Sequence, residues 1–170
     1  MSSNAANNLE VEEYYDERQK DTQKGKYLTF SVGKEEYGIE IKFVTEITCM
    51  QEITEVPELP SHVKGLINLR GKIIPVFDVR LRFKMPAIDY NDRTCIIIIN
   101  ICDVVAGLIV DSVDEVTAIG DHEISSLPNK KTGFHNRYIK GIGKIQNHVK
   151  LLLDCEKLFT EEEVAALTNI

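Results

Sequence analysis

The chain presents the same order of short segments twice, and this repeat restricts its fold more than any other feature. A shift of 69 positions places residues 37–41 (YGIEI) on residues 106–110 (AGLIV), and a shift of 76 places Gly65 on Gly141 and Asp78 on Asp154. Val and Ile crowd any strand, but glycines and acids that match in one order are harder to obtain by chance. Duplication and coincidence both remain open, and duplication explains more of the matches.

Each half of the repeat has the pattern of a small β unit. Residues 27–32 and 37–41 alternate between apolar and polar side chains, as a half-buried strand does. Further strands are predicted at 65–69 and 72–79, either side of an Arg70-Gly71 turn, and at 94–101, 104–110, 138–145 and 149–155. Pro75 has no N–H to donate, so its strand should be an edge strand or carry a bulge. About 65 residues of short strands in each half suit a small closed or nearly closed barrel.

The remaining segments connect or flank these strands. Residues 42–48 are predicted to form one or two helical turns, because Phe43, Val44 and Ile47 follow helical spacing. Residues 111–116 read as a linking segment and 121–136 as a loop, while residues 1–24 read as a mobile polar tail. A C-terminal helix is expected over 160–170, where Thr160 and Glu163 fit a capping box.

These segments predict two halves of similar size. The first β half spans about 25–90 and the second about 91–160, ahead of the helix over 160–170. The pattern leaves open whether strands are exchanged between the halves. Two small barrels side by side would leave a groove between them, and such grooves often bind ligands or partners.

Composition narrows the classes of partner. The formal net charge of −7 argues against nucleic acid, which needs a basic surface, and against an anionic membrane surface. The N-terminus has no secretory signal pattern, and the most apolar run, Cys95 to Cys102, is far too short to cross a bilayer. We therefore expect a cytoplasmic protein without direct membrane insertion.

The sequence shows no catalytic or metal-binding motif. The four cysteines have no C-x-x-C spacing, and three of them lie in apolar runs, so they are expected to be buried free thiols. The four histidines stand alone, and no nucleophile elbow, H-E-x-x-H or phosphate-binding loop is present. An acid–base pair among the many carboxylates stays open, but no pair stands out. We expect no catalytic residues, no metal and no cofactor.

One stretch carries a family resemblance. Residues 65–80, GLINLRGKIIPVFDVR, together with EEYGIEI at 35–41, resemble the CheW-like adaptors of bacterial chemotaxis, and the resemblance extends from about Lys26 to Leu167. It implies a mainly β fold of two intertwined SH3-like five-stranded β-barrels, without enzymatic activity. It also implies a bridging role between two partners, the cytoplasmic tip of chemoreceptors (methyl-accepting chemotaxis proteins) and the regulatory domain of the histidine kinase CheA. Such an adaptor would be recruited to membrane-associated receptor arrays.

The resemblance also nominates two binding surfaces. Arg70 matches the arginine that contacts the receptor, and its charged fork suits a carboxylate or backbone carbonyls on a partner helix. The whole receptor-binding set is Val44, Glu46, Gly65, Asn68, Leu69 and Arg70. The kinase-binding set is Met50, Ile53, Val56, Ile124 and Lys130. For Val44, Met50, Ile53 and Val56, ordinary core packing is the competing interpretation.

Two other functions are compatible with the sequence. The same scaffold could serve a kinase pathway other than chemotaxis, which only the identity of the receptor partner would decide. Alternatively, the groove between the halves could bind a small molecule.

Overall fold

The fold was obtained as a computed structural model that describes residues 23–127, 137–159 and 163. Residues 1–22 of the expected tail, the C-terminal helix apart from Glu163, and residues 128–136 lie outside the described part. The strands are β1 (Lys26–Val32), β2 (Glu35–Glu40), β3 (Val44–Cys49), β4 (Val63–Leu69), β5 (Lys72–Asp78), β6 (Cys95–Ile101), β7 (Val104–Val110), β8 (Ser112–Ala118), β9 (Ile124–Ser125), β10 (Ile139–Ile145) and β11 (His148–Leu153). The short helical elements are η1 (Ile41–Phe43), α2 (Val79–Arg82), η2 (Asp121–Glu123) and η4 (Cys155–Lys157).

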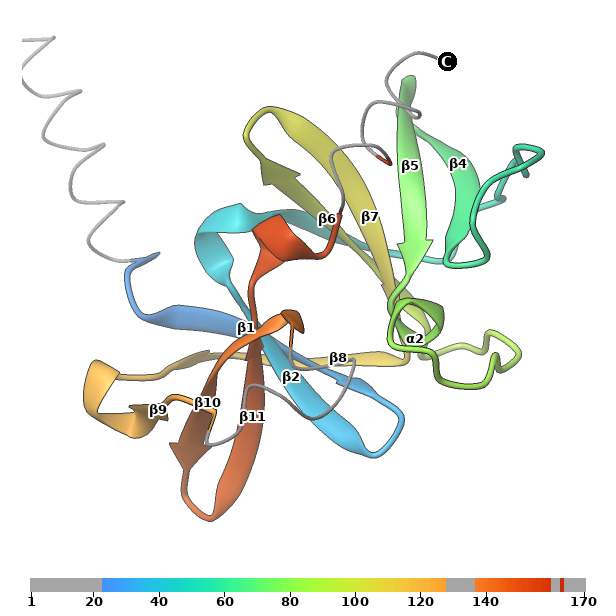
Figure 1. The fold of residues 1–170 in the computed structure, drawn as a ribbon. Helices are drawn as coiled ribbons and strands as arrows, with labels where there is room; N and C mark the ends of the chain where they lie inside the picture. Colours follow the sequence, from blue (N-terminus) through green and yellow to red (C-terminus); the bar gives the residue numbers. More distant parts are fainter. Residues whose placement is uncertain (1–22, 128–136, 160–162, 164–170) are drawn as a thin grey trace, which may run out of the picture.

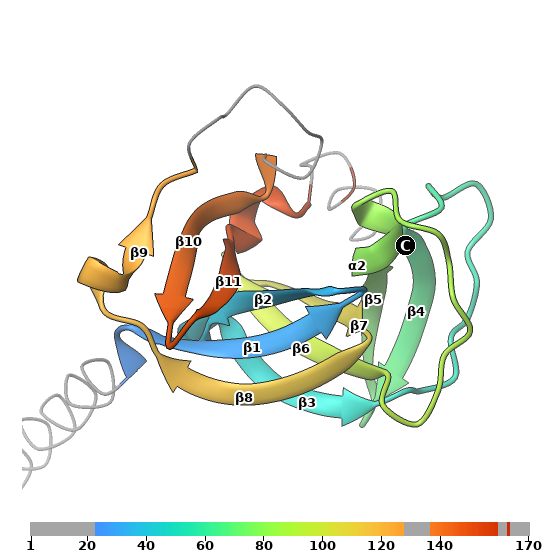
Figure 2. The ribbon, with the colours of Figure 1, turned by 90° about the horizontal axis from the view of Figure 1, so that it is seen from below.

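The strands form two sheets that pack against each other (Figures 1 and 2). Sheet A has the order β8-β1-β2-β11-β10-β9, and sheet B has the order β3-β6-β7-β5-β4. The predicted mainly β class is confirmed, with two sheets and few helices.

The repeat seen in the sequence is present in the backbone. Strands β1 to β5 correspond in order to β6, β7, β8, β10 and β11, and α2 corresponds to η4. Equivalent hydrogen bonds follow the same shift of 76: the Asp78 N–H donates to the His62 carbonyl at 2.7 Å, and the Asp154 N–H donates to the Tyr138 carbonyl at 2.8 Å. The backbone is therefore duplicated in its hydrogen bonding as well as in its order of strands.

Strands are exchanged between the two halves. The first-half strand β5 pairs in parallel with β7 of the second half, with Val76 opposite Gly107. The second-half strand β11 pairs with β2 in the equivalent way, with Leu152 opposite Gly38. Each sheet thus contains strands from both halves, and neither half supplies a whole sheet.

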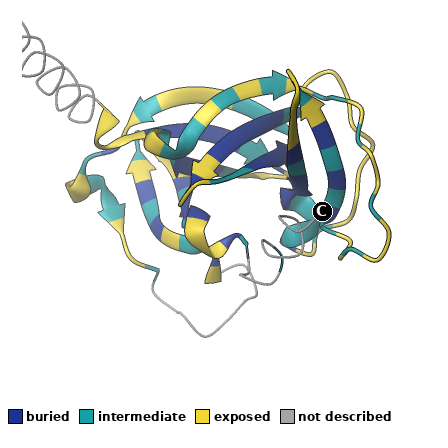
Figure 3. Ribbon diagram, turned by 90° about the horizontal axis from the view of Figure 1, so that it is seen from above, coloured by how far each residue is buried: buried dark blue, intermediate teal, exposed yellow. Residues whose placement is uncertain are grey.

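The core lies in three layers that follow the alternation of side chains along each strand. The largest, which we call the inter-sheet core, joins Leu28 and Phe30 of sheet A to Ile97 and Ile99 of sheet B. Ile96 and Ile98 face the opposite side of β6 and belong to a separate core of sheet B, and a smaller core of sheet A contains Tyr27, Ile119 and Leu152. Figure 3 shows the buried residues along the central strands. Side chains therefore fill the face between the sheets, where the sequence suggested a groove.

Two segments that were not predicted as strands are strands, and the loop expected over 121–136 contains the short elements η2 and β9 in its described part. Residues 42–48 do not form a helix: after the short η1, Val44 begins β3, which pairs antiparallel with β6. Residues 111–116 are not merely a link, because Ser112 begins β8, which pairs with β1. In both places, pairing with a distant strand satisfies the backbone and outweighs the local pattern.

The strand that contains Pro75 is not an edge strand. It lies between β7 and β4, and the irregularity falls on β4, which shifts register between Val63 and Gly65. The missing N–H of Pro75 is tolerated because pairing with β7 begins one residue later, at Val76.

Candidate protein-binding site

The turn between β4 and β5 displays Arg70. Arg70 and Gly71 both have positive φ, 51° and 87°, as a two-residue turn with right-handed strand twist requires. The Asn68 side-chain oxygen accepts a hydrogen bond from the Gly71 N–H at 2.9 Å and so supports the turn. The Arg70 side chain remains 72% exposed. The turn therefore presents a guanidinium to solvent on a supported backbone.

The Arg70 guanidinium pairs with Glu46 on β3, whose side chain is 28% exposed. Strands β3 and β4 stand at opposite ends of the order of sheet B, so this ion pair joins its two edges. Nearby, a backbone bridge joins the segment after β3 to β4, with Thr54 and Leu66 exchanging hydrogen bonds of 2.8 and 2.9 Å. Glu46 and Arg70, both members of the predicted receptor-binding set, are thus in direct contact.

The other predicted receptor residues have different surroundings. Val44 packs against the inter-sheet core, whereas Leu69 packs against the core of sheet B, so they do not form one apolar wall. Gly65 is buried, with φ of 144°, and a Cβ at this position would lie 2.1 Å from the Thr54 carbonyl oxygen. Gly65 therefore allows the segment after β3 to approach β4.

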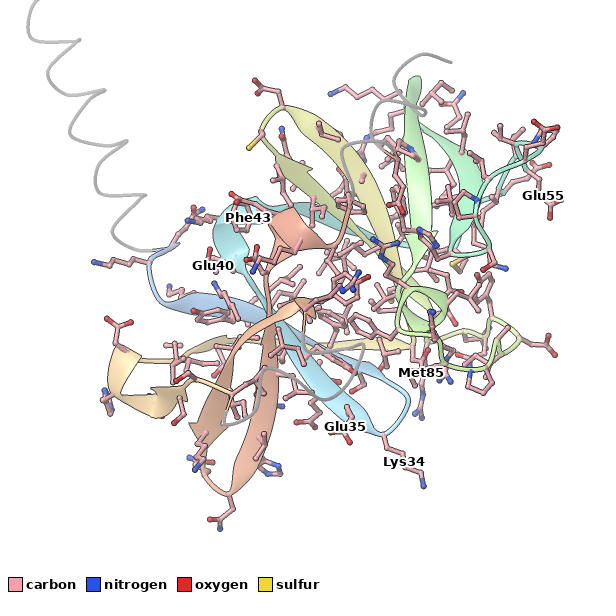
Figure 4. The ribbon with its side chains drawn as sticks, in the orientation of Figure 1. Lys34, Glu35, Glu40, Phe43, Glu55 and Met85 are labelled. Carbon is pink, nitrogen blue, oxygen red and sulfur yellow. The ribbon has the colours of Figure 1, made fainter. Side chains whose placement is uncertain are left out.

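The predicted kinase-binding residues lie on two separate segments. Met50 and Ile53 are half-buried and pack against the core of sheet B, and Val56 is half-buried further along the same segment. We call residues 50–56 the β3–β4 segment; the exposed Glu55, labelled in Figure 4, marks its outer edge. Ile124 begins β9 and packs against the core of sheet A, and Lys130 lies outside the described residues.

Two exposed apolar side chains that were not among the predicted site residues lie near the Arg70 turn and Glu46. Ile73 is 62% exposed and lies directly opposite Asn68 across the β4–β5 ladder, close to the turn. Ile47 is 44% exposed on β3, one residue after Glu46. Their repeat equivalents, Val149 and Val116, are also exposed, so these positions face outward in both halves, which the apolar residue types alone do not reveal.

His62, one of the four histidines without a metal-ligand spacing, is largely buried. Its side chain is only 13% exposed, and its Nε2 lies 3.0 Å from a Glu163 carboxylate oxygen. The same oxygen accepts a hydrogen bond from Arg82 at 2.9 Å. This cluster holds Glu163 against the start of β4 and the helix α2, which is a structural role.

The cysteines differ from expectation, since only Cys155 is buried, while Cys49 and Cys102 are exposed and Cys95 is half-buried. Burial raises the pKa of the Cys155 thiol to about 12, so this thiol stays protonated and unreactive. Among the described residues, no group of three or more His, Cys, Asp or Glu side chains is placed to hold a metal ion. No helix in the described part is long and apolar enough to span a membrane.

Comparison with known proteins identifies the scaffold. The model of the CheW-like domain matches residues 26–163. The chain is 34% identical over 144 residues to the chemotaxis protein CheW of Klebsiella aerogenes, covering 85% of this chain and 87% of that protein. It is 34% identical over 137 residues to the chemotaxis protein CheW of Bacillus subtilis, covering 81% of this chain and 88% of that protein.

A solved structure agrees with this match. The scaffolding protein TtCheW from Thermoanaerobacter tengcongensis superposes with a TM-score of 0.74 at 37% identity, over 79% of this chain and 92% of that one. The duplicated strand order, the exposed Arg70 turn and these matches over most of the chain lead to one conclusion: the chain belongs to the CheW-like domain family.

Proposed function

We propose that the chain is a chemotaxis adaptor that holds the cytoplasmic tip of a chemoreceptor on one surface and the regulatory domain of the kinase CheA on another. An adaptor role in chemotaxis follows from the family and from relatives named chemotaxis protein CheW. The division into two surfaces follows the family resemblance, which assigns the Arg70 turn to the receptor and the β3–β4 segment to the kinase.

The observation that carries the receptor side is the exposed guanidinium of Arg70 on a supported turn. Its Glu46 partner orients the side chain, yet the pair is accessible enough for a partner carboxylate or carbonyl to compete for the same donors. Ile73 supplies an exposed apolar contact beside the turn. A helix with polar and apolar residues on one face would meet both.

The kinase side is assigned to the β3–β4 segment and, more distantly, to the region of Ile124 and Lys130. Met50 and Ile53 anchor the segment through the core of sheet B, so contact with a partner would involve its exposed residues, such as Glu52 and Glu55, and the remaining surface of Val56. Such contacts with the core fix the conformation of a loop before binding, so less conformational entropy is lost when a partner binds.

The proposal includes three further statements. Each sheet closes into a small SH3-like barrel, which the Thr54–Leu66 bridge supports for sheet B and the pairing of β9 with β10 supports for sheet A. The protein works by binding and carries out no chemical step. It resides in the cytoplasm and joins membrane-associated receptor arrays through its partners.

Co-sedimentation with receptor fragments and kinase tests the proposal. Wild-type protein should pellet with both partners, and Arg70→Glu should lose the receptor while it retains the kinase. Gln146→Glu is the matched control, because Gln146 occupies the equivalent turn in sheet A, also with positive φ. Receptor binding that survives Arg70→Glu unchanged would disprove the site, and failure of the wild type to bind either partner would disprove the adaptor role.

A further inference from the structure

Two of the four cysteines are direct neighbours across a pair of strands. Cys49 is the last residue of β3 and Cys95 is the first residue of β6, and the antiparallel register places them opposite each other. Directly opposed residues in such a ladder project from the same face of the sheet. The two thiols therefore share a face at one end of the β3–β6 ladder.

The hydrogen-bonding pattern places this pair at a position suited to a cross-link. The two-residue turn Cys102-Asp103 makes Ile101 and Val104 a hydrogen-bonded pair of the β6–β7 ladder. Hydrogen-bonded and non-hydrogen-bonded pairs alternate along such a ladder, so every second residue before Ile101, down to Cys95, directs its backbone N–H and C=O groups toward β7. Opposite β3, Cys95 is consequently in a non-hydrogen-bonded pair with Cys49. Such pairs have Cα atoms about 4.5 Å apart, inside the roughly 4.4 to 6.8 Å that disulfides span.

Both thiols can be reached by a small oxidant. Cys49 is exposed and Cys95 is half-buried. Their present contacts are weak: the Cys95 thiol donates to the Arg93 carbonyl at 3.1 Å, and Cys49 sulfur accepts from the Gln51 amide at 3.8 Å.

We propose that Cys49 and Cys95 form a dithiol oxidation site that closes reversibly into a cross-strand disulfide. With hydrogen peroxide as oxidant, one thiolate attacks a peroxide oxygen, takes it up as a sulfenic acid and releases water after protonation. The second thiol then attacks the sulfenic sulfur, the S–S bond forms and a second water leaves. Two thiols and one peroxide give one disulfide and two waters. Two molecules of a low-molecular-weight thiol then restore the pair by exchange and leave as their own disulfide.

The other two cysteines serve as internal controls. Cys102 is exposed but lies at the opposite end of β6, about 20 Å away along a strand of this length. Cys155 is buried in the inter-sheet core. Neither can replace a member of the pair while the fold is intact.

The cross-link would act where the β3–β4 segment begins, because Met50 follows Cys49 directly. It would tie the start of that segment to the start of β6. The oxidation site itself does not depend on the proposed adaptor function.

Intact-mass analysis after thiol alkylation tests the proposal. The full-length reduced protein, denatured and alkylated, should take up four labels, one for each cysteine. After native protein is treated with hydrogen peroxide, it should take up two labels and lose two hydrogen atoms, and tandem mass spectrometry should place the bond between Cys49 and Cys95. Dithiothreitol should restore four labels.

Variants make the result specific. Cys102→Ser should form the same cross-link at the wild-type rate, whereas Cys49→Ser, at an exposed position, should form no intramolecular disulfide while its circular dichroism matches wild type. Peroxide treatment in urea should abolish the preference for this pair. Four labels after peroxide, or a bond that involves Cys102 or a second molecule, would overturn the proposal.

Discussion

Replacing Gly65 by alanine tests whether this glycine supports the β3–β4 segment. The new Cβ would lie 2.1 Å from the Thr54 carbonyl oxygen, so the segment must move away from β4. The movement breaks the two backbone hydrogen bonds between Thr54 and Leu66, each worth about 1 kcal/mol. An alanine with φ near 144° adds strain of about 1 to 3 kcal/mol. We expect the free energy of unfolding to fall by about 3 to 5 kcal/mol, a large part of the roughly 5 to 15 kcal/mol of a typical domain.

Urea titration and thermal melts measure this loss. For a chain of this size, the melting temperature should fall by about 10 °C. Gly71→Ala is the matched control, since it also places alanine at a positive φ, of 87°, but no atom lies within 4 Å of its Cβ. Gly71→Ala should lower the free energy of unfolding by only about 1 kcal/mol. Equal losses for the two variants would refute the reasoning, as would a loss below about 1 kcal/mol for Gly65→Ala.

Three further predictions address the turn, the repeat and alkaline pH. Arg70→Asn creates Asn-Gly, the favoured pair for this turn, so the melting temperature should stay within about 3 °C of wild type while receptor affinity in a binding titration falls about tenfold or more. Asp78→Ala should lower the free energy of unfolding, measured by urea titration, by about 2 to 3 kcal/mol, because the buried carboxylate accepts hydrogen bonds from the Leu81 N–H and the Tyr90 hydroxyl. The same change at the repeat equivalent, Asp154→Ala, should lower it by about 1 kcal/mol. Burial raises the pKa of Cys155 from 9.0 to about 12, so the stability that its neutral thiol contributes is complete below pH 9 and is lost as the pH rises toward 12. Urea titrations between pH 9 and pH 12 should show that the free energy of unfolding declines with rising pH, and the decline should be shallower in Cys155→Ala.

Sequence patterns predicted the structure best where two strands that are adjacent in sequence pair through a short turn. The predicted strands at 94–101 and 104–110 match β6 and β7 almost residue for residue. Alternation could not identify both faces of β6, because apolar side chains fill each of them: Ile96 and Ile98 enter one core, and Ile97 and Ile99 enter another. The predicted helix at 42–48 failed for the opposite reason, since its spacing was local evidence for a segment whose structure depends on pairing with β6.

The candidate site was only partly predictable for the same reason. Arg70 could be located from the turn and the family motif, but its contact with Glu46 spans 24 positions and forms only after β3 and β4 are joined at the edges of sheet B. Gly65 could not be recognised as a support for Thr54, because a glycine in a strand pattern does not reveal which backbone approaches it. The exchange of strands was also hidden, since the parallel pairs β5–β7 and β11–β2 link segments from different halves.

The duplicated backbone allows the two halves to be compared position by position. The turns at Arg70-Gly71 and Gln146-Asn147 share positive φ at both residues, so backbone conformation does not distinguish them. The difference lies in side chains: the first turn carries a guanidinium, and inside the sheets Ile74 in sheet B corresponds to Lys150 in sheet A, which is buried and paired with Glu36. The Glu36 side chain is 38% exposed, so the pair is only partly buried, but removing Glu36 would still leave the buried Lys150 ammonium unpaired. An apolar core, in contrast, tolerates exchange of similar side chains. At these equivalent positions sheet B therefore combines an apolar interior with an exposed charged turn, whereas sheet A combines a charged interior position with an uncharged turn.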